Sequence, residues 1–337
     1  MSRAVSRVLV ARLDSDGDVL LAGPAVRAVA ASAEVVLLVG PRGRQAAALL
    51  PGVAETLVWR APWIDPSPDP VDPSDVDRLV AAVRAAGVSA AVVLTSFHQS
   101  ALPLALLLRL AGVGYVAAVS EDYPGSLLDV RHRVDDDLPE PERALSTVEA
   151  AGFALPPGDD GRLRVRTPLP PVSPLTGAGP YVVVHPGASV PARAWSPARA
   201  AAAVEELTAA GRRVVVTGGP GEAALTAAVA GPGTDLGGRT GFAELAAVLA
   251  GADAVVVGNT GPAHLAAAVG TPVVSLFAPV VPAARWAPYG VPCVLLGDQD
   301  APCRDSRATV CPVPGHPCLD SVTPQDVVAA VDKVVSV

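Results

Sequence analysis

The fold of this chain is decided by residues 255–272, which read VVVGNTGPAHLAAAVGTP. A β-branched run enters a short polar turn, and an alanine-rich segment follows and stops at Gly270. Asn259 or Thr260 suits the N-cap of a helix, and Pro262 suits its first turn. Gly270 suits the position just past the helix end. The pattern therefore predicts a buried strand followed directly by a short, well-capped helix.

The first amides of this predicted helix form a candidate anion site. A helix N-terminus carries unpaired N–H groups and a partial positive charge, so it binds phosphates well. We expect the backbone N–H groups of Thr260, Gly261 and Ala263 to be free for this purpose. The alternative is a capped strand–helix connection without a ligand, because many α/β turns look the same.

Length and composition favour a two-domain globular protein that does not bind nucleic acid. The chain has 337 residues, of which 50% are hydrophobic, and its net charge is −8. This length suits two domains of about 150 residues each. No block of Lys and Arg and no aromatic–basic interleaving is present, so nucleic acid is not an expected partner. Lys333 is the sole lysine, which indicates a general preference for arginine.

Targeting and membrane signals are weak along this sequence. The N-terminus lacks the basic, apolar and small-residue layout of a signal peptide. The most membrane-like segment is 101–119, but Pro103, Arg109, Gly112 and Gly114 interrupt it. It is better explained as a buried helix that runs into a strand. We therefore expect a soluble, cytoplasmic protein.

Strand and helix patterns alternate through both halves, which favours parallel sheets covered by helices on both faces. In the first half we expect strands at 8–13, 35–39, 56–59 and 91–95, and helices at 19–31, 44–50, 76–86 and 100–110. In the second half we expect strands at 181–185, 213–217, 254–257 and 273–277, and helices at 197–210, 222–230, 242–250, 264–269 and 324–335.

A change of composition separates the two halves. Pro, Gly, Ser and Thr accumulate over 164–180, which predicts a linker between domains 1–168 and 169–337. The final helix is expected either to stay with the second domain or to pack back on the first. Ligands of open α/β sheets bind beyond the carboxyl ends of the strands. Two such sheets facing each other would form a cleft containing four turns, at residues 14–18, 185–193, 217–222 and 258–264.

The first of these turns is acidic. It has no Gly-x-Gly-x-x-Gly pattern, which argues against NAD(P) or FAD, and instead places Asp14, Asp16 and Asp18 around Gly17. An aspartate at a helix start commonly interacts with the helix dipole. The alternative is that Asp18 takes a proton from a sugar hydroxyl.

The second turn combines a glycine, a hydroxyl and a guanidinium. Gly187 allows close backbone approach, and Ser189 offers a hydroxyl. Arg193 could place its planar fork on a diphosphate leaving group, or it could be a solvated surface arginine. Trp195 is expected to be a packing residue rather than a stacking platform.

The third turn and the helix after 258–260 add polar candidates. Thr217 and Glu222 flank a glycine-rich turn, where Glu222 could bind a ribose or cap the following helix. His264 lies one turn into the predicted helix. A lone histidine in an apolar helix is more often a core residue, but the neighbouring anion site favours a functional role.

The four cysteines lie in the last fifth of the chain, at Cys293, Cys303, Cys311 and Cys318. Their spacing does not match a zinc ribbon. Reduced, buried thiols or a local redox pair are the expectation for a cytosolic chain, and a metal site, with His316 close by in the sequence, is the less favoured alternative.

Taken together, the turns resemble glycosyltransferase family 9, the heptosyltransferase-like enzymes. Three segments carry the resemblance, 14–25 (DSDGDVLLAGPA), 185–197 (HPGASVPARAWSP) and 258–266 (GNTGPAHLA), and it extends from Arg7 to about Val331. The third segment is the most specific, and the order and spacing of all three are more specific still.

The resemblance implies a GT-B architecture, in which two Rossmann-like doubly wound domains face each other across a cleft. It implies an N-terminal acceptor-binding domain, a C-terminal nucleotide-sugar-binding domain, and inverting, metal-independent transfer without a cofactor. Asp18 matches the family's general base. The donor site implied by the matching positions comprises Gly17, Gly187, Ser189, Arg193, Thr217, Glu222, Asn259, Thr260, Gly261 and His264. The implied partners are a nucleoside diphosphate sugar and a carbohydrate or lipid-linked acceptor. Peripheral contact of the protein with the inner face of the membrane stays open.

Two positions depart from the family pattern. Members commonly have aspartate at the place of Asn259 and lysine at the place of Arg193. The amide removes a negative charge from the donor pocket, so the donor sugar could differ from ADP-heptose. Two other functions stay open: a nucleotide-sugar 2-epimerase on the same fold, and a catalytically inactive nucleotide-sugar-binding protein.

Overall fold

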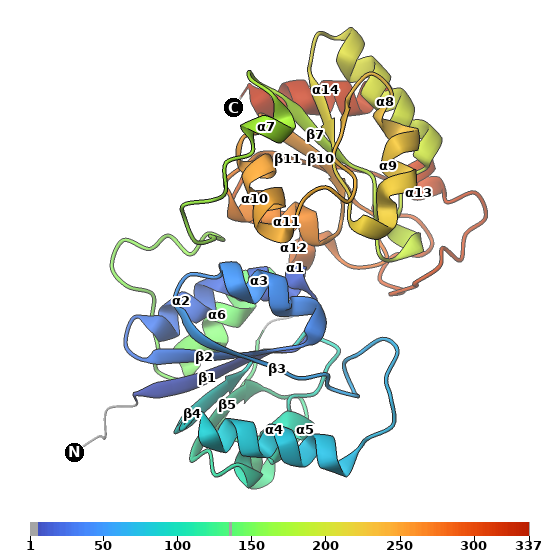
Figure 1. Ribbon diagram of the computed structural model, residues 1–337. Coiled ribbons are helices and arrows are strands. Elements are labelled where there is room, and N and C mark those ends of the chain that lie inside the picture. The colour runs from blue at the N-terminus through green and yellow to red at the C-terminus, as the bar shows by residue number, and fades with distance from the viewer. Residues whose placement is uncertain (1–5, 135–136, 337) are drawn as a thin grey trace. The chain divides into compact units, whose positions relative to one another are not determined.

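The computed structural model describes residues 6–134 and 137–336 (Figure 1). The chain divides into two compact units, with the division between Arg166 and Thr167. This point lies inside the segment expected to be a linker. None of the helices in the described residues is both long and apolar enough to span a membrane.

The first unit is a parallel six-stranded sheet covered on both faces. Its strands are β1 (Arg7–Arg12), β2 (Glu34–Val39), β3 (Val53–Val58), β4 (Ala90–Val93), β5 (Tyr115–Val119) and β6 (Val130–His132). Its helices are α1 (Asp16–Leu21), α2 (Gly23–Ala30), α3 (Arg44–Leu49), α4 (Pro73–Ala85), α5 (Leu102–Leu110) and α6 (Glu140–Ala150). Figure 1 shows α1, α2, α3 and α6 on one face and α4 and α5 on the other.

The strand order of this sheet is β3-β2-β1-β4-β5-β6, the doubly wound order of Rossmann-type sheets. Successive side chains of a strand point to opposite faces. Leu9 and Ala11 of β1 lie in one core cluster with Leu79 of α4 and Leu104 of α5. Arg12 therefore lies on the opposite face, which α1 and α6 cover.

The second unit repeats this architecture. Its strands are β7 (Val182–His185), β8 (Val214–Val216), β9 (Thr234–Asp235), β10 (Ala254–Gly258), β11 (Val273–Leu276) and β12 (Cys293–Leu296), in the order β12-β11-β10-β7-β8-β9. Its helices are α7 (Ser173–Thr176), α8 (Pro197–Ala209), α9 (Ala223–Ala230), α10 (Phe242–Ala250), α11 (Gly261–Ala268), α12 (Ala283–Trp286), α13 (Pro317–Asp320) and α14 (Pro324–Val335). All the sheet pairings are parallel.

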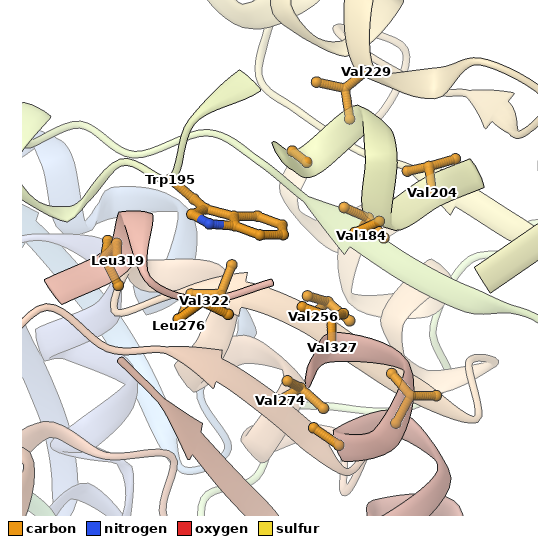
Figure 2. Packing of buried hydrophobic residues seen from close by; sticks show 14 of the residues in the cluster. Val184, Trp195, Val204, Val229, Val256, Val274, Leu276, Leu319, Val322 and Val327 are labelled. Carbon is orange, nitrogen blue, oxygen red and sulfur yellow. The ribbon is translucent and has the colours of Figure 1, made fainter. Parts of the chain in front are cut away.

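The core of the second unit confirms the expectation for Trp195. Its indole is buried in a cluster with residues of β7, β10, β11, α8 and α14 (Figure 2). Val184 of β7, Leu276 of β11 and Val322 are labelled around it in the same view. The final helix, α14, packs on α8 and on the strands of its own unit.

The structure corrects the expectation of a single helix over 19–31. Two helices occupy this region, and they are separated at Ala22. The cause is Pro24, because a proline inside a helix lacks the N–H donor and clashes with the carbonyl four residues earlier. Pro24 instead occupies the first turn of α2, where no N–H is needed.

Several elements, most of them short, lay outside the sequence expectations. They are β6, β9, β12, α6, α7, α12 and α13. The edge strands β6, β9 and β12 are mostly half-buried; β6 and β9 are short and contain polar residues, whereas β12 (CVLL) is apolar but only four residues long. Helix α5 buries Leu104 and Leu108, as expected of a packed helix, but it exposes Leu106 and Leu110.

Candidate functional site

Each sheet reverses its winding between two neighbouring strands, and the site residues gather there. The reversal lies between β1 and β4 in the first unit and between β7 and β10 in the second. Ligands of doubly wound sheets bind at the carboxyl ends of such strand pairs. In this chain, those ends lead into residues 13–18 and 94–100 in the first unit, and into 186–193 and 259–262 in the second.

A buried arginine organises the reversal point of the first unit. Arg12, the last residue of β1, is almost fully buried. Its Nη1 donates to Glu140 Oε2 at 3.1 Å, and its Nη2 donates to Asp18 Oδ1 at 3.1 Å and to Ser96 Oγ at 2.8 Å. Its Nε lies 2.9 Å from Asp14 Oδ2. One guanidinium thus holds three carboxylates.

The charge of Arg12 is well stabilised despite its burial. Burial alone would lower the pKa of the guanidinium, but the charges of Asp14, Glu140 and Asp18 outweigh this effect and raise it. Burial also raises the pKa of Asp14, although Arg12 opposes the shift. Asp14 in addition accepts a hydrogen bond from the Gln99 side chain.

The three aspartates of the first turn have separate roles. Asp14 faces Arg12 and Gln99. Asp16 accepts a hydrogen bond from the Ala46 amide at 2.8 Å, and burial raises the pKa of Asp16 to about 6. Asp18 shares Arg12 with Asp14 and Glu140.

Asp18 combines a structural contact with partial exposure. It is the third residue of α1, and its Oδ2 accepts hydrogen bonds from Ser15 Oγ at 2.8 Å and Ser15 N at 3.3 Å, as in a capping box. Its side chain is 22% exposed, against 11% for Asp14 and 1% for Glu140. Of the three carboxylates, Asp18 is therefore the one that solvent or a substrate reaches most easily.

Sequence reasoning missed Arg12, Ser96 and Glu140. A charged residue that ends an otherwise apolar strand was a signal for Arg12, since charges are rarely fully buried without partners. Glu140 gave no comparable signal, because it lies in a charged stretch that reads like a solvated surface.

A histidine at the end of β7 lies among residues from the third turn. His185 Nδ1 is 2.9 Å from Thr217 Oγ1, and His185 Nε2 is 3.9 Å from Glu222 Oε2. Burial lowers the pKa of His185, although the charge of Glu222 opposes the shift. The imidazole is thus neutral near pH 7, and it fixes the Thr217 hydroxyl.

Glu222 has local structural contacts of its own. Its Oε2 accepts a hydrogen bond from the Gly219 amide at 2.7 Å, at the start of the turn that leads into α9. Its carboxylate also lies against the α-carbon of Gly187. The close approach expected at Gly187 is therefore made by a side chain of the protein. Ser189, two residues after Gly187, is exposed to solvent.

Arg193 lies beside the turn after β10. Its Nη1 donates to the carbonyl oxygen of Asn259 at 3.5 Å. The main chain is close as well, since a Cβ built on Gly258 would lie 3.1 Å from the Arg193 carbonyl oxygen. The structure thus brings the predicted guanidinium to the residue that precedes the N-cap of α11.

The side chain of Asn259 is occupied by the main chain. Its Nδ2 donates to the Ala278 carbonyl at 3.2 Å, and its Oδ1 accepts from the Ala278 amide at 3.4 Å. An amide satisfies both backbone groups of Ala278, whereas a carboxylate lacks the donor. This pairing is a structural reason for the amide at position 259.

Helix α11 is capped as expected, but two of the amides expected to be free at its start are hydrogen-bonded. Thr260 is the N-cap residue in extended conformation, Gly261 begins the helix, and Gly270 has a positive φ of 84° just beyond the helix end. The amide of Thr260 donates to Gly258 O, and that of Ala263 donates to Thr260 O. The expectation that both are free is wrong, because the tight turn uses them itself. His264 is buried within α11.

The C-terminal segment, residues 303–318, contacts Ala192, the residue before Arg193. The amide of Ala192 donates to the Thr309 carbonyl at 3.0 Å, and the carbonyl of Ala192 lies 3.1 Å from His316 Nε2. This segment also carries three of the cysteines. Through these two contacts, the C-terminal segment supports the short 3₁₀ turn Pro191–Arg193.

The four cysteines are free thiols. Cys303 and Cys318 are buried in the core of the second unit. Burial raises the pKa of Cys293 to about 12 and that of Cys318 to about 11. Across residues 6–134 and 137–336, no group of three His, Cys, Asp or Glu side chains is spaced to hold a metal ion.

Comparison with known proteins identifies relatives. The sequence profile described as "Glycosyltransferase family 9 (heptosyltransferase)" matches residues 78–315, which is more than half of the chain. Among curated proteins, none matches this chain.

Solved structures of the same architecture cover nearly the whole chain. A family 9 glycosyltransferase from Veillonella parvula superposes with a TM-score of 0.78 at 16% identity, over 99% of both chains. The ADP-heptose LPS heptosyltransferase II of E. coli gives 0.74 at 17% identity, over 98% of both chains. E. coli heptosyltransferase WaaC, solved with ADP-2-deoxy-2-fluoro heptose, gives 0.73 at 22% identity, over 97% of this chain and 99% of that one. The expected GT-B fold is confirmed.

Proposed function

This chain belongs to glycosyltransferase family 9, the heptosyltransferase family, and is a glycosyltransferase; from that premise we propose an inverting, metal-independent transfer. The donor is a nucleoside diphosphate sugar, and the acceptor is a hydroxyl of a glycan or glycolipid. The observation that carries the proposal is the position of Asp18, a partly exposed carboxylate at the reversal point of the first sheet. A carboxylate held in this way can accept the proton of an attacking hydroxyl.

The donor is proposed to bind at the reversal point of the second sheet. Arg193 lies beside Asn259 there, and α11 begins at Gly261. The guanidinium is always charged and offers a fork that fits a diphosphate, and the helix N-terminus adds a partial positive charge. WaaC, a structural relative, has been solved with ADP and with ADP-2-deoxy-2-fluoro heptose, which supports a nucleoside diphosphate sugar as the donor.

These groups define the proposed chemistry. Asp18 removes the proton as the acceptor oxygen attacks the anomeric carbon from the face opposite the diphosphate, so the configuration inverts. Negative charge builds on the departing diphosphate, where Arg193 and the α11 dipole stabilise it. That stabilisation takes the role that a divalent cation has in other transferases.

The acceptor is proposed to bind in the first unit. A hollow of about 220 Å³ lies at the ends of β4 and β5, and its lining includes Phe97, His98, Gln99 and Ser120. Gln99 also donates to Asp14, so this hollow adjoins the carboxylate network. Hydroxyl-bearing, aromatic and amide side chains are the usual partners of sugars.

A donor screen tests the function directly. Thermal unfolding is measured with ADP-, GDP-, UDP- and dTDP-sugars, because a ligand that binds the folded state raises the midpoint. The stabilising donor is then incubated with and without candidate acceptors. Consumption of the donor only with an acceptor supports transfer, whereas conversion of the sugar without an acceptor indicates an epimerase.

Two variants test the assigned roles. Asp18→Asn keeps the side-chain shape and should lower turnover by about 10²–10⁴ while nucleotide binding persists. Asp77→Asn, at an exposed position, serves as the control.

Arg193→Ala should weaken nucleotide diphosphate binding. Arg304→Ala, which removes a surface arginine of the same unit, should not. Normal turnover in Asp18→Asn, or normal affinity in Arg193→Ala, rejects the corresponding role.

A further inference from the structure

We propose that Glu140 is a positioning residue for the transfer reaction: its pairing with Arg12 holds the guanidinium behind Asp18 and offsets its charge, which keeps Asp18 basic. This inference rests on the proposed role of Asp18 as the base. It concerns a residue that lies 128 positions away from Arg12 in the chain.

The geometry shows why Glu140 acts through Arg12. Glu140 begins α6 and is almost fully buried, and its Oε2 accepts from Arg12 Nη1 at 3.1 Å. The other terminal nitrogen of Arg12 bridges Asp18 and Ser96. A guanidinium is planar and rigid, so fixing Nη1 on Glu140 also fixes the direction in which Nη2 meets Asp18.

The charges show why the pairing affects basicity. A single arginine in contact with an aspartate lowers the pKa of that aspartate by about 1–3 units, which makes the carboxylate a weaker base. Here the same guanidinium is shared with Glu140 inside the protein. The Arg12–Glu140 pair acts on Asp18 as a dipole rather than as a full positive charge. Asp18 keeps its orientation without losing all of its proton affinity.

Other charged groups surround α1, and they set the background for this effect. They come from the end of β1 and its turn, from α1 itself, and from the elements that pack on α1, which are α2, the segment leading into α3, α3 and α6: Arg12, Asp14, Asp16, Arg27, Arg42, Arg44, Glu140, Glu142 and Arg143. Asp14 also faces Arg12, and burial raises its pKa. Asp14 and Glu140 therefore both offset the charge of Arg12, and they lie against different nitrogens of its guanidinium.

The test removes the charge of Glu140 and follows Asp18. In Glu140→Gln the amide keeps an acceptor for Arg12 but no longer offsets its charge. We expect the acidic limb of the kcat/KM profile to move down by about one pH unit, and kcat to fall about threefold to tenfold because the base is weaker. Nucleotide affinity should not change. Glu140→Asp should restore the wild-type pH profile in part, and the exposed Glu149→Gln on the same helix should leave it unmoved.

A double variant should shift the acidic limb of the kcat/KM profile in the opposite direction. In Arg12→Gln/Glu140→Gln both charges are gone, so Asp18 loses its cationic neighbour and the acidic limb should move above that of the wild type. This variant removes both charges of the Arg12–Glu140 pair together; Asp14, which also loses its ion pair with Arg12, still accepts a hydrogen bond from Gln99. An unmoved limb in these variants would show that Glu140 serves packing alone.

Direct titration separates this inference from the proposed function. The carboxyl ¹³C shift of Asp18, assigned by comparison with Asp18→Asn in the full chain, reports its pKa without any turnover. A lower pKa in Glu140→Gln supports the inference even where no transfer is found, and an unchanged pKa overturns it. Retained turnover in Asp18→Asn instead overturns the assignment of the base.

Discussion

The carboxylate of Glu222 occupies the space in which a side chain of residue 187 would lie. A Cβ built on Gly187 would stand 2.0 Å from Glu222 Oε1 and 2.4 Å from its Cδ. The glycine at position 187 and the acid at position 222 are therefore one packing unit, formed between the ends of β7 and β8. The same carboxylate caps the Gly219 amide, so it cannot move away without cost.

This contact predicts coupled effects of substitution. Gly187→Ala should lower the free energy of unfolding by about 1–3 kcal/mol, because the added methyl group overpacks the site. In a Glu222→Ala background the same change should cost much less, since the obstructing carboxylate is gone. Chemical denaturation of the four proteins of this cycle measures the coupling. Additive effects would show that the backbone, not Glu222, selects glycine here.

Asp16 predicts a stability that depends on pH. Burial raises its pKa to about 6 in the folded chain, above the ordinary value of 3.8. The folded state therefore holds the proton more tightly, and this group lowers the free energy of unfolding as the pH rises from about 4 to 6.

Asp16→Asn should therefore stabilise the protein near pH 7, by about 1–2 kcal/mol, and have little effect near pH 4. The amide oxygen can still accept from the Ala46 amide. Asp72→Asn is a matched control of opposite sign, because hydrogen bonds from Ser74 lower the pKa of Asp72. Urea unfolding at both pH values checks this, and an equal effect of Asp16→Asn at pH 4 and pH 7 would contradict it.

Asn259→Asp tests the role of the amide beside the proposed donor site. An aspartate would place a carboxylate oxygen against the Ala278 carbonyl, where Asn259 Nδ2 now donates. We expect a loss of about 1–3 kcal/mol at neutral pH, as for other buried groups left without a partner. The loss should shrink near pH 4, where a protonated carboxyl can donate again. A stability equal to that of wild type at pH 7 would show that the Ala278 contact is dispensable.

His316→Ala tests whether the C-terminal segment supports Arg193. The variant removes the imidazole next to the Ala192 carbonyl, which should loosen the Pro191–Arg193 turn. Because one hydrogen bond contributes about 0.5–1.5 kcal/mol, we expect nucleotide affinity to fall about twofold to tenfold. Isothermal titration with the donor found in the screen measures this, with Arg304→Ala as control. Unchanged affinity would separate this segment from the donor site.

Local patterns in the sequence predicted the architecture well. The capped turn around Thr260 and the helix end at Gly270 follow from residues that are neighbours in the chain, and the structure confirms both. Alternating apolar strands and helices were enough to predict two parallel sheets. Edge strands such as β6 and β9 were missed because they are short, half-buried and lack a continuous apolar run.

The candidate site was predicted less completely. The sequence singled out Asp18 and Arg193, but it did not reveal that Asp18 shares a guanidinium with Glu140. It also suggested free amides at Thr260 and Ala263, which the tight turn uses internally. Such contacts depend on which groups face each other after packing.

The sequence by itself determined the doubly wound sheets, the capped helix α11 and the family, because each rests on short-range periodicity, turn chemistry or a motif. Only the tertiary structure decided which charges meet, since Arg12 and Glu140 come together through the packing of α6 against the sheet. It also decided that Asn259 pairs with Ala278 and that Glu222 lies on Gly187. Local preferences fix the elements, but long-range packing sets the electrostatics of the site.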